Sequence, residues 1–177
     1  MTETTTFLML AGRPALDFCN TRLGGKELLG RPADLEQWLI EAGLAVKRPI
    51  ISPAELDDAR RLRDGLRPAL LGADRRGVAR IAEGWLDGAP GHLCVEEETL
   101  RPRFAPGATS CRCLLVAAVL DALDLMRESP DRVRECADPI CPVLFVDTSR
   151  NRSRRWCSME GCGARAKAAT YYRRHRV

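Results

Sequence analysis

Two pairs of cysteines in the last quarter of the chain constrain its fold more than any other feature. Cys136 and Cys141 are separated by four residues, and Cys157 and Cys162 repeat this spacing after an interval of fifteen residues. Two close pairs across a spacer allow a short chain to surround a tetrahedral ion, with each pair supplying one side. Because four soft thiolates complete the shell of Zn²⁺, the spacing predicts one structural zinc ion with no open position for water.

Two other interpretations of these four cysteines stay open. They could be ordinary buried thiols, or they could bind an iron–sulfur cluster, although cluster-binding loops are usually more tightly spaced and more apolar. His175 follows Cys162 by thirteen residues and is not needed to complete the shell. A segment this short has too little core to fold alone, so we expect bound zinc to stabilise it substantially.

The other four cysteines have no partner by spacing. Cys111 and Cys113 are two residues apart on a predicted helix, so their side chains point to different faces. Cys19 and Cys94 stand alone in the sequence. We therefore interpret all four as small buried hydrophobic residues.

The sequence predicts a cytoplasmic protein without membrane contact. The N-terminus has no basic region followed by an apolar stretch, which argues against a secretory signal. The longest apolar run, residues 114–120, is far shorter than the roughly 20 residues that span a bilayer. In a reducing cytoplasm, we expect the cysteines to be thiols or metal thiolates instead of disulfides.

The chain before the cysteine pairs predicts a mostly helical domain. Its 177 residues, 45% hydrophobic, fit one or two globular domains. Apolar spacing predicts helices over residues 31–44, 53–67 and 108–127, and a further helix over residues 78–86, between Gly77 and Asp87. Ser52 and Glu55 form a capping box for the second of these helices, and Pro68 is expected to kink or stop it.

The remaining segments before residue 130 have strand-like patterns. Residues 7–10 are expected to form a strand, and residues 92–95 and 100–104 a short edge hairpin. Residues 129–131 break the last helix and mark a domain boundary. The predicted fold class is α+β. A predominantly α-helical N-terminal domain with a short β-hairpin spans residues 1–130, and a small four-cysteine zinc-binding module ending in a helix spans residues 131–177.

Positive charge is concentrated in the same C-terminal segment as the paired cysteines. Residues 1–130 hold 17 basic and 19 acidic groups, whereas residues 131–177 hold 11 and 5. Residues 148–177 hold nine basic groups and the single acid Glu160. From about Ala164, alanines alternate with long basic side chains and no helix breaker occurs, which predicts a basic helix beside the zinc site. A basic module of this kind commonly binds nucleic acid.

We predict that this basic segment contacts DNA. Arginine can bind phosphate or guanine with two hydrogen bonds, and asparagine can add further ones. The expected contact residues are Arg150, Asn151, Arg152, Arg154, Arg155, Arg165, Lys167, Arg173 and Arg174. Arg154, Arg155 or backbone amides are also expected to stabilise the anionic thiolate site, and Trp156 to pack over it. The alternative is a solvated basic tail that only keeps the protein soluble.

The C-terminal sequence strongly resembles the bacterial CGNR zinc finger family. The matching motifs are the cysteine pair Cys136 and Cys141, residues 145–151, residues 154–159, and the Cys-Gly-Ala-Arg run at residues 162–165. Residues 16–21 and 34–39 also resemble the companion ABATE domain. The resemblance therefore covers nearly the whole chain.

The resemblance implies a stress-induced transcription regulator with a mostly helical N-terminal domain and a zinc-dependent, DNA-binding C-terminus. The N-terminal domain is expected to sense a small-molecule effector or to hold a protein partner. One departure is that Ala164 stands where the family has the asparagine of its name. Alanine cannot cap the following helix or hydrogen-bond a base, so this change affects base preference or the helix end and not the metal site.

Two other functions compete with DNA binding. In the first, the zinc module shapes a surface for an acidic protein partner without binding DNA. In the second, the N-terminal domain is an enzyme that uses Asp17, Asn20, His92 or residues 96–98. We expect no enzyme, because a full four-cysteine shell leaves no catalytic metal position and two histidines offer little acid–base chemistry.

Overall fold

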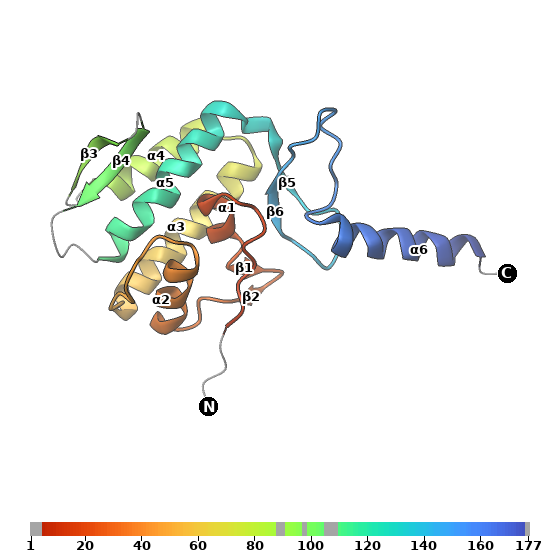
Figure 1. The fold of residues 1–177 in the computed structure, drawn as a ribbon, viewed down its shortest axis with the longest axis horizontal. Coiled ribbons are helices and arrows are strands. Elements are labelled where there is room, and N and C mark those ends of the chain that lie inside the picture. The colour runs from red at the N-terminus through yellow and green to blue at the C-terminus, as the bar shows by residue number, and fades with distance from the viewer. Residues whose placement is uncertain (1–4, 88–90, 97–98, 105–109, 176–177) are drawn as a thin grey trace.

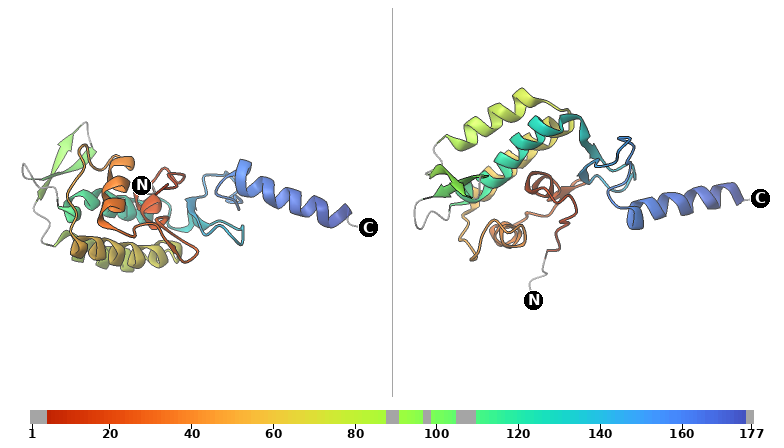
Figure 2. Two further views of the ribbon diagram at one scale, coloured as in Figure 1. Left: turned by 90° about the horizontal axis from the view of Figure 1, so that it is seen from below. Right: turned by 45° about the horizontal axis from the view of Figure 1, so that its top comes forward.

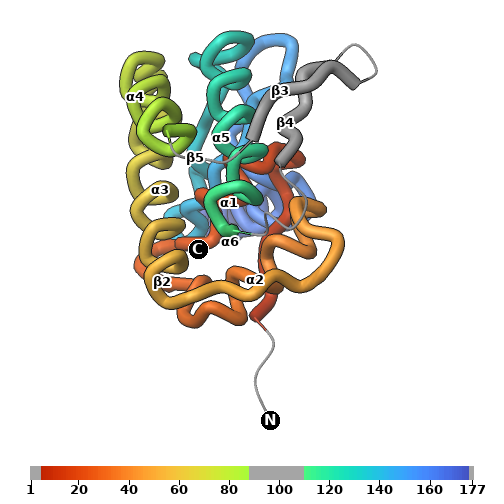
Figure 3. The backbone as a smooth tube through the Cα atoms, turned by 90° about the vertical axis from the view of Figure 1, so that its left-hand side faces the viewer, coloured from red at the N-terminus to blue at the C-terminus, as the bar shows by residue number. Residues whose placement is uncertain are grey.

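The computed structural model describes residues 5–87, 91–96, 99–104 and 110–175, and the side chains within residues 5–87 and 110–175. The N-terminal part is a helical body, from which a small C-terminal module and a last helix extend (Figure 1). The helices of the body are α1 (Pro14–Cys19), α2 (Pro32–Glu41), α3 (Pro53–Leu71), α4 (Arg75–Leu86) and α5 (Cys111–Glu128). The long helices α3, α4 and α5 run side by side, as the view from the far end of the body shows (Figure 3).

The strands of the described chain form three separate antiparallel hairpins. They are β1 (Arg22–Leu23) with β2 (Lys26–Glu27), β3 (Gly91–Glu96) with β4 (Thr99–Phe104), and β5 (Val133–Glu135) with β6 (Leu144–Val146). The second is the predicted hairpin, in which His92 lies opposite Arg103. The chain then passes through the turn η2 (Met159–Gly163) into α6 (Ala164–His175), where the basic helix was predicted to begin. The predicted α+β fold class is confirmed.

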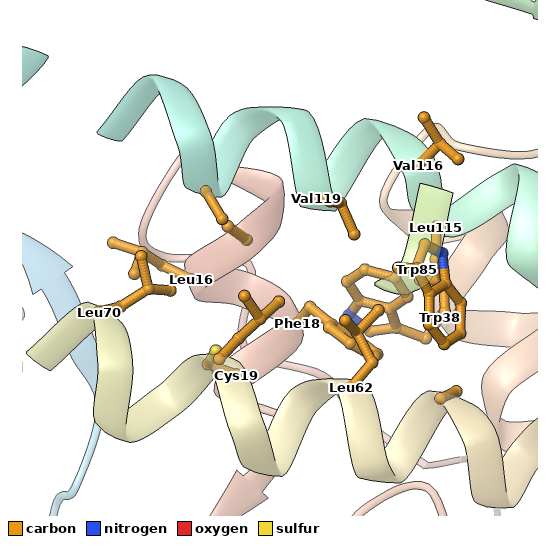
Figure 4. Packing of buried hydrophobic residues seen from close by; sticks show 14 of the residues in the cluster. Leu16, Phe18, Cys19, Trp38, Leu62, Leu70, Trp85, Leu115, Val116 and Val119 are labelled. Atoms are coloured by element: carbon orange, nitrogen blue, oxygen red, sulfur yellow. The ribbon is translucent and has the colours of Figure 1, made fainter. Parts of the chain in front are cut away.

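The core of the body is built around the short helix α1. Residues 15–19 of this helix are all buried. Leu16 and Phe18 lie between α3 and α5 (Figure 4), and the Phe18 ring is 5.1 Å from the ring of Trp38 on α2. Burial of apolar area stabilises each of these contacts, so α1 fixes the positions of its neighbouring helices.

Two local predictions differ from the structure. Residues 7–10 form no strand, although Phe7 is buried in the core. Helix α3 keeps its capping box at Ser52 and Glu55 but continues through Pro68 to Leu71. Leu70 is fully buried in the core, and this packing outweighs the hydrogen bond that Pro68 cannot donate.

The C-terminal module is joined to the helical body by two buried hydrogen bonds and by an ion pair at the surface. Asn20, just after α1, donates from Nδ2 to the carbonyl of Leu144 over 3.0 Å and accepts the Leu144 N–H over 2.8 Å. Arg67 on α3 pairs with Glu135 on β5 at 2.9 Å. Leu144 is itself part of the core of the body. The division at residue 130 stays a prediction, and the packing is continuous across it.

The β1–β2 hairpin also contacts the module. Its two-residue turn is formed by Gly24 and Gly25, whose φ angles are +55° and +87°. Left-handed angles of this kind favour glycine because a Cβ atom would be strained there. Leu23 packs against the hydrophobic cluster of the module.

Among the described residues, no helix combines the length and the apolar character that crossing a membrane would need.

We expect Asn20→Ala to destabilise the protein, because it leaves the buried N–H and carbonyl of Leu144 without their hydrogen-bond partner. The loss of unfolding free energy should be about 1–3 kcal/mol, measured by urea denaturation. The matched control is Asn151→Ala, which removes an exposed asparagine of the basic segment. Equal stabilities of the two variants would contradict the fastening role of Asn20.

Candidate metal centre and nucleic-acid interface

The first cysteine pair is positioned by the β5–β6 hairpin. Cys136 follows β5 directly, and its N–H donates to the carbonyl of Val143 over 2.9 Å. A turn closed by the Cys141 N–H and the Asp138 carbonyl, 2.9 Å apart, returns the chain toward β6. The hairpin and this turn bring the two thiols to one end of the module.

The second cysteine pair lies on a turn that leads into α6. The Ser158 hydroxyl caps this turn by accepting the Gly161 N–H over 3.2 Å. A Cβ atom at Gly163 would lie 3.1 Å from Met159 and 3.3 Å from the Trp156 ring, so the turn leaves little room for a side chain there. Cys157 and Cys162 are both buried by this arrangement.

The four sulfur atoms converge at one point. All of them lie within 4.8 Å of one another. The Cys157 sulfur is 3.7 Å from that of Cys141 and 3.6 Å from that of Cys162. A tetrahedral ion with Zn–S bonds of roughly 2.3 Å sets its sulfurs roughly 3.8 Å apart. The four-cysteine cluster therefore fits one zinc ion in both donor chemistry and size.

The protein supplies hydrogen bonds to the sulfur atoms. Arg165, in the first turn of α6, donates from Nη2 to the Cys162 sulfur over 2.9 Å, and its Nε bonds Asp138 over 3.0 Å. The backbone N–H of Cys157 donates to the Cys136 sulfur over 3.5 Å. Such contacts orient thiolate ligands and offset their negative charge. The expected contribution of a backbone amide is therefore met by Cys157, whereas the arginine that contacts a sulfur atom is Arg165, which was not among those expected to stabilise the site.

Burial and neighbouring hydrogen bonds set the pKa values of the ionisable groups in and beside the cluster. Burial raises the pKa of Cys157 to about 11, and it also raises the pKa of Cys162. The backbone N–H of Ile140, together with the Arg165 guanidinium, holds the pKa of Asp138 below its ordinary value. A metal cation that binds here has to displace thiol protons, whereas Asp138 stays ionised to hold Arg165.

Asp147 organises the loop between the two cysteine pairs. It is fully buried and accepts hydrogen bonds from the N–H and hydroxyl of Ser149 and from the N–H of Arg154. Although burial alone would raise it, these hydrogen bonds keep the pKa of Asp147 below its ordinary value. The loop tip, which carries Arg150 and Asn151, is consequently held outside the module and exposed.

The structure divides the predicted DNA-contact residues into two groups. In the first group, basic side chains are used within the protein. Arg154 donates to the carbonyls of Trp156 and Cys157 and lies over the Phe145 ring. Arg165 serves the cluster as described, and Arg152 pairs with Asp131. Their predicted DNA contacts stay untested.

The second group projects into solvent. Arg155 lies over the Trp156 ring, 5.2 Å from its centroid, and is exposed. Of the predicted DNA-contact residues, those that are exposed and have no ion pair with another described residue are Arg150, Asn151, Arg155, Lys167, Arg173 and Arg174. Helix α6 carries three of these cations and has no buried residue. It points away from the body in both views of Figure 2. Ala164, which replaces the family asparagine, is also exposed at the start of this helix.

Residues considered for an enzyme site have structural partners instead. Asp17 accepts the Ala11 N–H over 2.9 Å, and Asn20 holds Leu144 as described above. The side chains of His92, Cys94 and residues 96–98 lie outside the described part of the chain. Cys19, Cys111 and Cys113 are buried, as predicted.

Sequence reasoning missed Asn20, Asp138 and Asp147 as residues that shape the site. Asp138 stands two residues after a predicted ligand, which was an available signal for a supporting role. Asn20 is 124 residues from its partner Leu144, and nothing local to either residue indicates the contact.

The fold and the site define a helical domain joined to a small zinc-finger module. Residues 132–175 match the family model of the CGNR zinc finger. Residues 12–129 match that of the ABATE family, which is described as "Putative stress-induced transcription regulator". Because this second match covers more than half of the chain, the protein belongs to the ABATE family, and its C-terminal module is a CGNR zinc finger. A search of curated proteins gave no significant match.

We expect Cys162→Ser to lower the zinc content from one ion per chain, because hydroxyls are poor zinc ligands. The matched control is Cys113→Ser, which changes a cysteine of the helical body and should retain one zinc. Zinc is measured by atomic emission on protein purified without added metal. One zinc per chain in Cys162→Ser would contradict the four-cysteine site.

We expect Arg165→Ala to weaken metal binding by about 10- to 100-fold, as is typical when a residue that orients a metal ligand is lost. Arg173→Ala, later in the same helix, should leave the affinity unchanged. Competition with a chromophoric chelator measures the affinity, and the thiolate-to-metal absorption of the Co²⁺ form should shift in the first variant alone. Identical affinities and spectra would show that Arg165 does not support the cluster.

Proposed function

We propose that this protein is a transcription regulator that binds duplex DNA through α6 and the neighbouring loop of residues 148–153. In this proposal, Cys136, Cys141, Cys157 and Cys162 hold one structural zinc ion. The observation that carries it is the exposure of α6, a basic helix that has no buried residue and begins beside the cysteine cluster. Membership in a family of transcription regulators supports the same conclusion.

The dimensions and charge of α6 suit a DNA groove. An α-helix with its side chains is about 10–12 Å wide, and the major groove of B-DNA is about 12 Å wide. Lys167, Arg173 and Arg174 supply positive charge along the helix, and Arg150 and Arg155 supply it beside the helix. A 12-residue helix is only marginally stable by itself in water. Its attachment to the cluster therefore matters for presenting these cations together.

Each part of the module has a task in this proposal. The four cysteines would hold the zinc ion, which would join the two cysteine turns. Arg165 and Asp138 keep the first turn of α6 against the cysteine cluster. Asp147 holds the loop so that Arg150 and Asn151 are exposed and can contact the DNA. Asn20 and Arg67 fix the orientation of the module relative to the helical body.

We further propose that the helical body senses a small-molecule effector or holds a protein partner. The hydrogen bonds of Asn20 to Leu144 support this role, because through them a ligand-induced shift of α1 would move β6, the strand beside the cluster. The described part of the body has a shallow hollow of about 480 Å³ between α3 and α4, lined by Gly65, Asp74 and Arg80 among others.

We expect the zinc-loaded protein to bind duplex DNA with an affinity that falls steeply as salt increases. The double variant Arg150→Gln/Arg173→Gln should reduce the slope of log affinity against log salt by about 2, because each phosphate contact contributes about 0.9. Fluorescence anisotropy with labelled duplex measures both quantities.

The charge-matched control is Arg75→Gln/Arg76→Gln on α4, where both arginines are exposed and the slope should not change. A zinc-loaded protein without salt-dependent binding at low ionic strength would contradict the proposal. The competing function, recognition of an acidic protein without DNA binding, predicts that the unmodified protein binds an acidic protein partner but no DNA, and that the first double variant loses this partner. Arg154 is unsuitable for this comparison because it supports the backbone of the module.

A further inference from the structure

An open hollow of about 400 Å³ lies along one side of α6, next to the second cysteine pair. Trp156 and Gly163 form its inner end, and Lys167, Thr170, Tyr171 and Arg174 line it along the helix. Among the described residues that line the hollow, none is acidic. A site of this composition favours an anion that also carries an apolar surface.

The hollow occupies the face of α6 that is free of the cluster. Lys167, Thr170 and Arg174 follow one another at intervals of three and four residues, so they share one side of the helix. Arg165 precedes Lys167 by two residues, which places it roughly 200° around the helix axis. Because Arg165 is bound to Asp138 and Cys162, the hollow faces away from the first cysteine pair.

The chemistry of the hollow matches a sugar–phosphate strand. Lys167 and Arg174 are exposed cations, seven residues or about 10 Å apart along the helix. Trp156 is half-buried and presents a broad apolar surface at the inner end. The Thr170 hydroxyl already donates to the Ala166 carbonyl over 2.9 Å, so its methyl group is the part free to pack.

We propose that this hollow seats one strand of the bound DNA, with phosphates on Lys167 and Arg174 and deoxyribose against the Trp156 ring. The inference rests on the proposed DNA binding and adds which face of α6 meets the nucleic acid. Trp156 thereby gains a role beyond packing over the cysteine cluster. Gly163 contributes by leaving space for this ring, since a Cβ atom there would lie 3.3 Å from it.

Tryptophan fluorescence gives a direct test. Trp38 is 0% exposed and Trp85 is 7% exposed in the core of the body, so a collisional quencher such as acrylamide acts mainly on Trp156. Saturating duplex DNA should protect the zinc-loaded protein from quenching. Trp156→Phe should abolish this DNA-dependent change, which assigns the signal. Zinc content and thermal unfolding of each variant verify that the module is intact.

Two double variants with the same loss of charge separate the hollow from the rest of the basic surface. Lys167→Gln/Arg174→Gln should reduce the salt slope by about 2 and leave Trp156 open to acrylamide even at saturating DNA. Arg150→Gln/Arg173→Gln should reduce the slope similarly but retain full protection of Trp156.

Each remaining outcome counts against the inference in a distinct way. If DNA binds while Trp156 stays open to acrylamide in the unmodified protein, the hollow is not the seat of the strand, although the proposed function stands. If the zinc-loaded protein binds no DNA, both fail together. If deoxyadenosine monophosphate protects Trp156 at the same nucleotide concentration as duplex, the ligand is a free nucleotide and not a DNA strand.

Discussion

The convergence of four sulfur atoms within 4.8 Å is the constraint on which the C-terminal module depends. Few apolar side chains are buried around the cysteines, chiefly Val143 and Phe145, because Val133 and Leu144 belong to the core of the body. Its hairpin, loop and final helix all begin or end at a cysteine pair. Helix α6 has no buried residue, so its direction is set through Cys162 and the Arg165–Asp138 pair instead of by packing. Apolar burial alone gives the hairpin, the loop and the final helix few contacts with one another. A metal ion bound by the four cysteines would therefore stabilise their arrangement.

Arginines of the same segment carry out opposite tasks. Arg154 and Arg165 turn inward, where they bind backbone carbonyls or a sulfur atom and act as parts of the fold. Arg150 and Arg174 turn outward and keep their charge available to a polyanion. The net charge of residues 148–177 is larger than the positive charge available at the surface, because some of these basic side chains are bound to other groups of the protein. Guanidinium groups suit both tasks, since they form several directed hydrogen bonds and stay charged at any physiological pH.

Local patterns predicted the elements whose causes are local. The capping box at Ser52 and Glu55 and the start of α6 near Ala164 both appear in the structure, because each depends on neighbouring residues. The strand expected over residues 7–10 does not form, since a strand needs a partner that sequence alone cannot supply. Pro68 was expected to kink or stop α3, yet burial of Leu70 carries the helix further. In both cases tertiary packing overrides a local preference.

The sequence by itself determined the four cysteines as one cluster, the basic helix after it and the family to which the chain belongs. These features depend on spacing and composition, which are fully present in the linear chain. Only the tertiary structure decided that Asn20 fastens the module to the body, that Arg165 serves the cluster, and that Trp156 shares a hollow with Lys167 and Arg174. Asn20 and Leu144 are 124 residues apart in the chain, and the side from which Arg165 and Lys167 project depends on how α6 is attached. Such contacts exist only after folding has fixed the directions of the side chains.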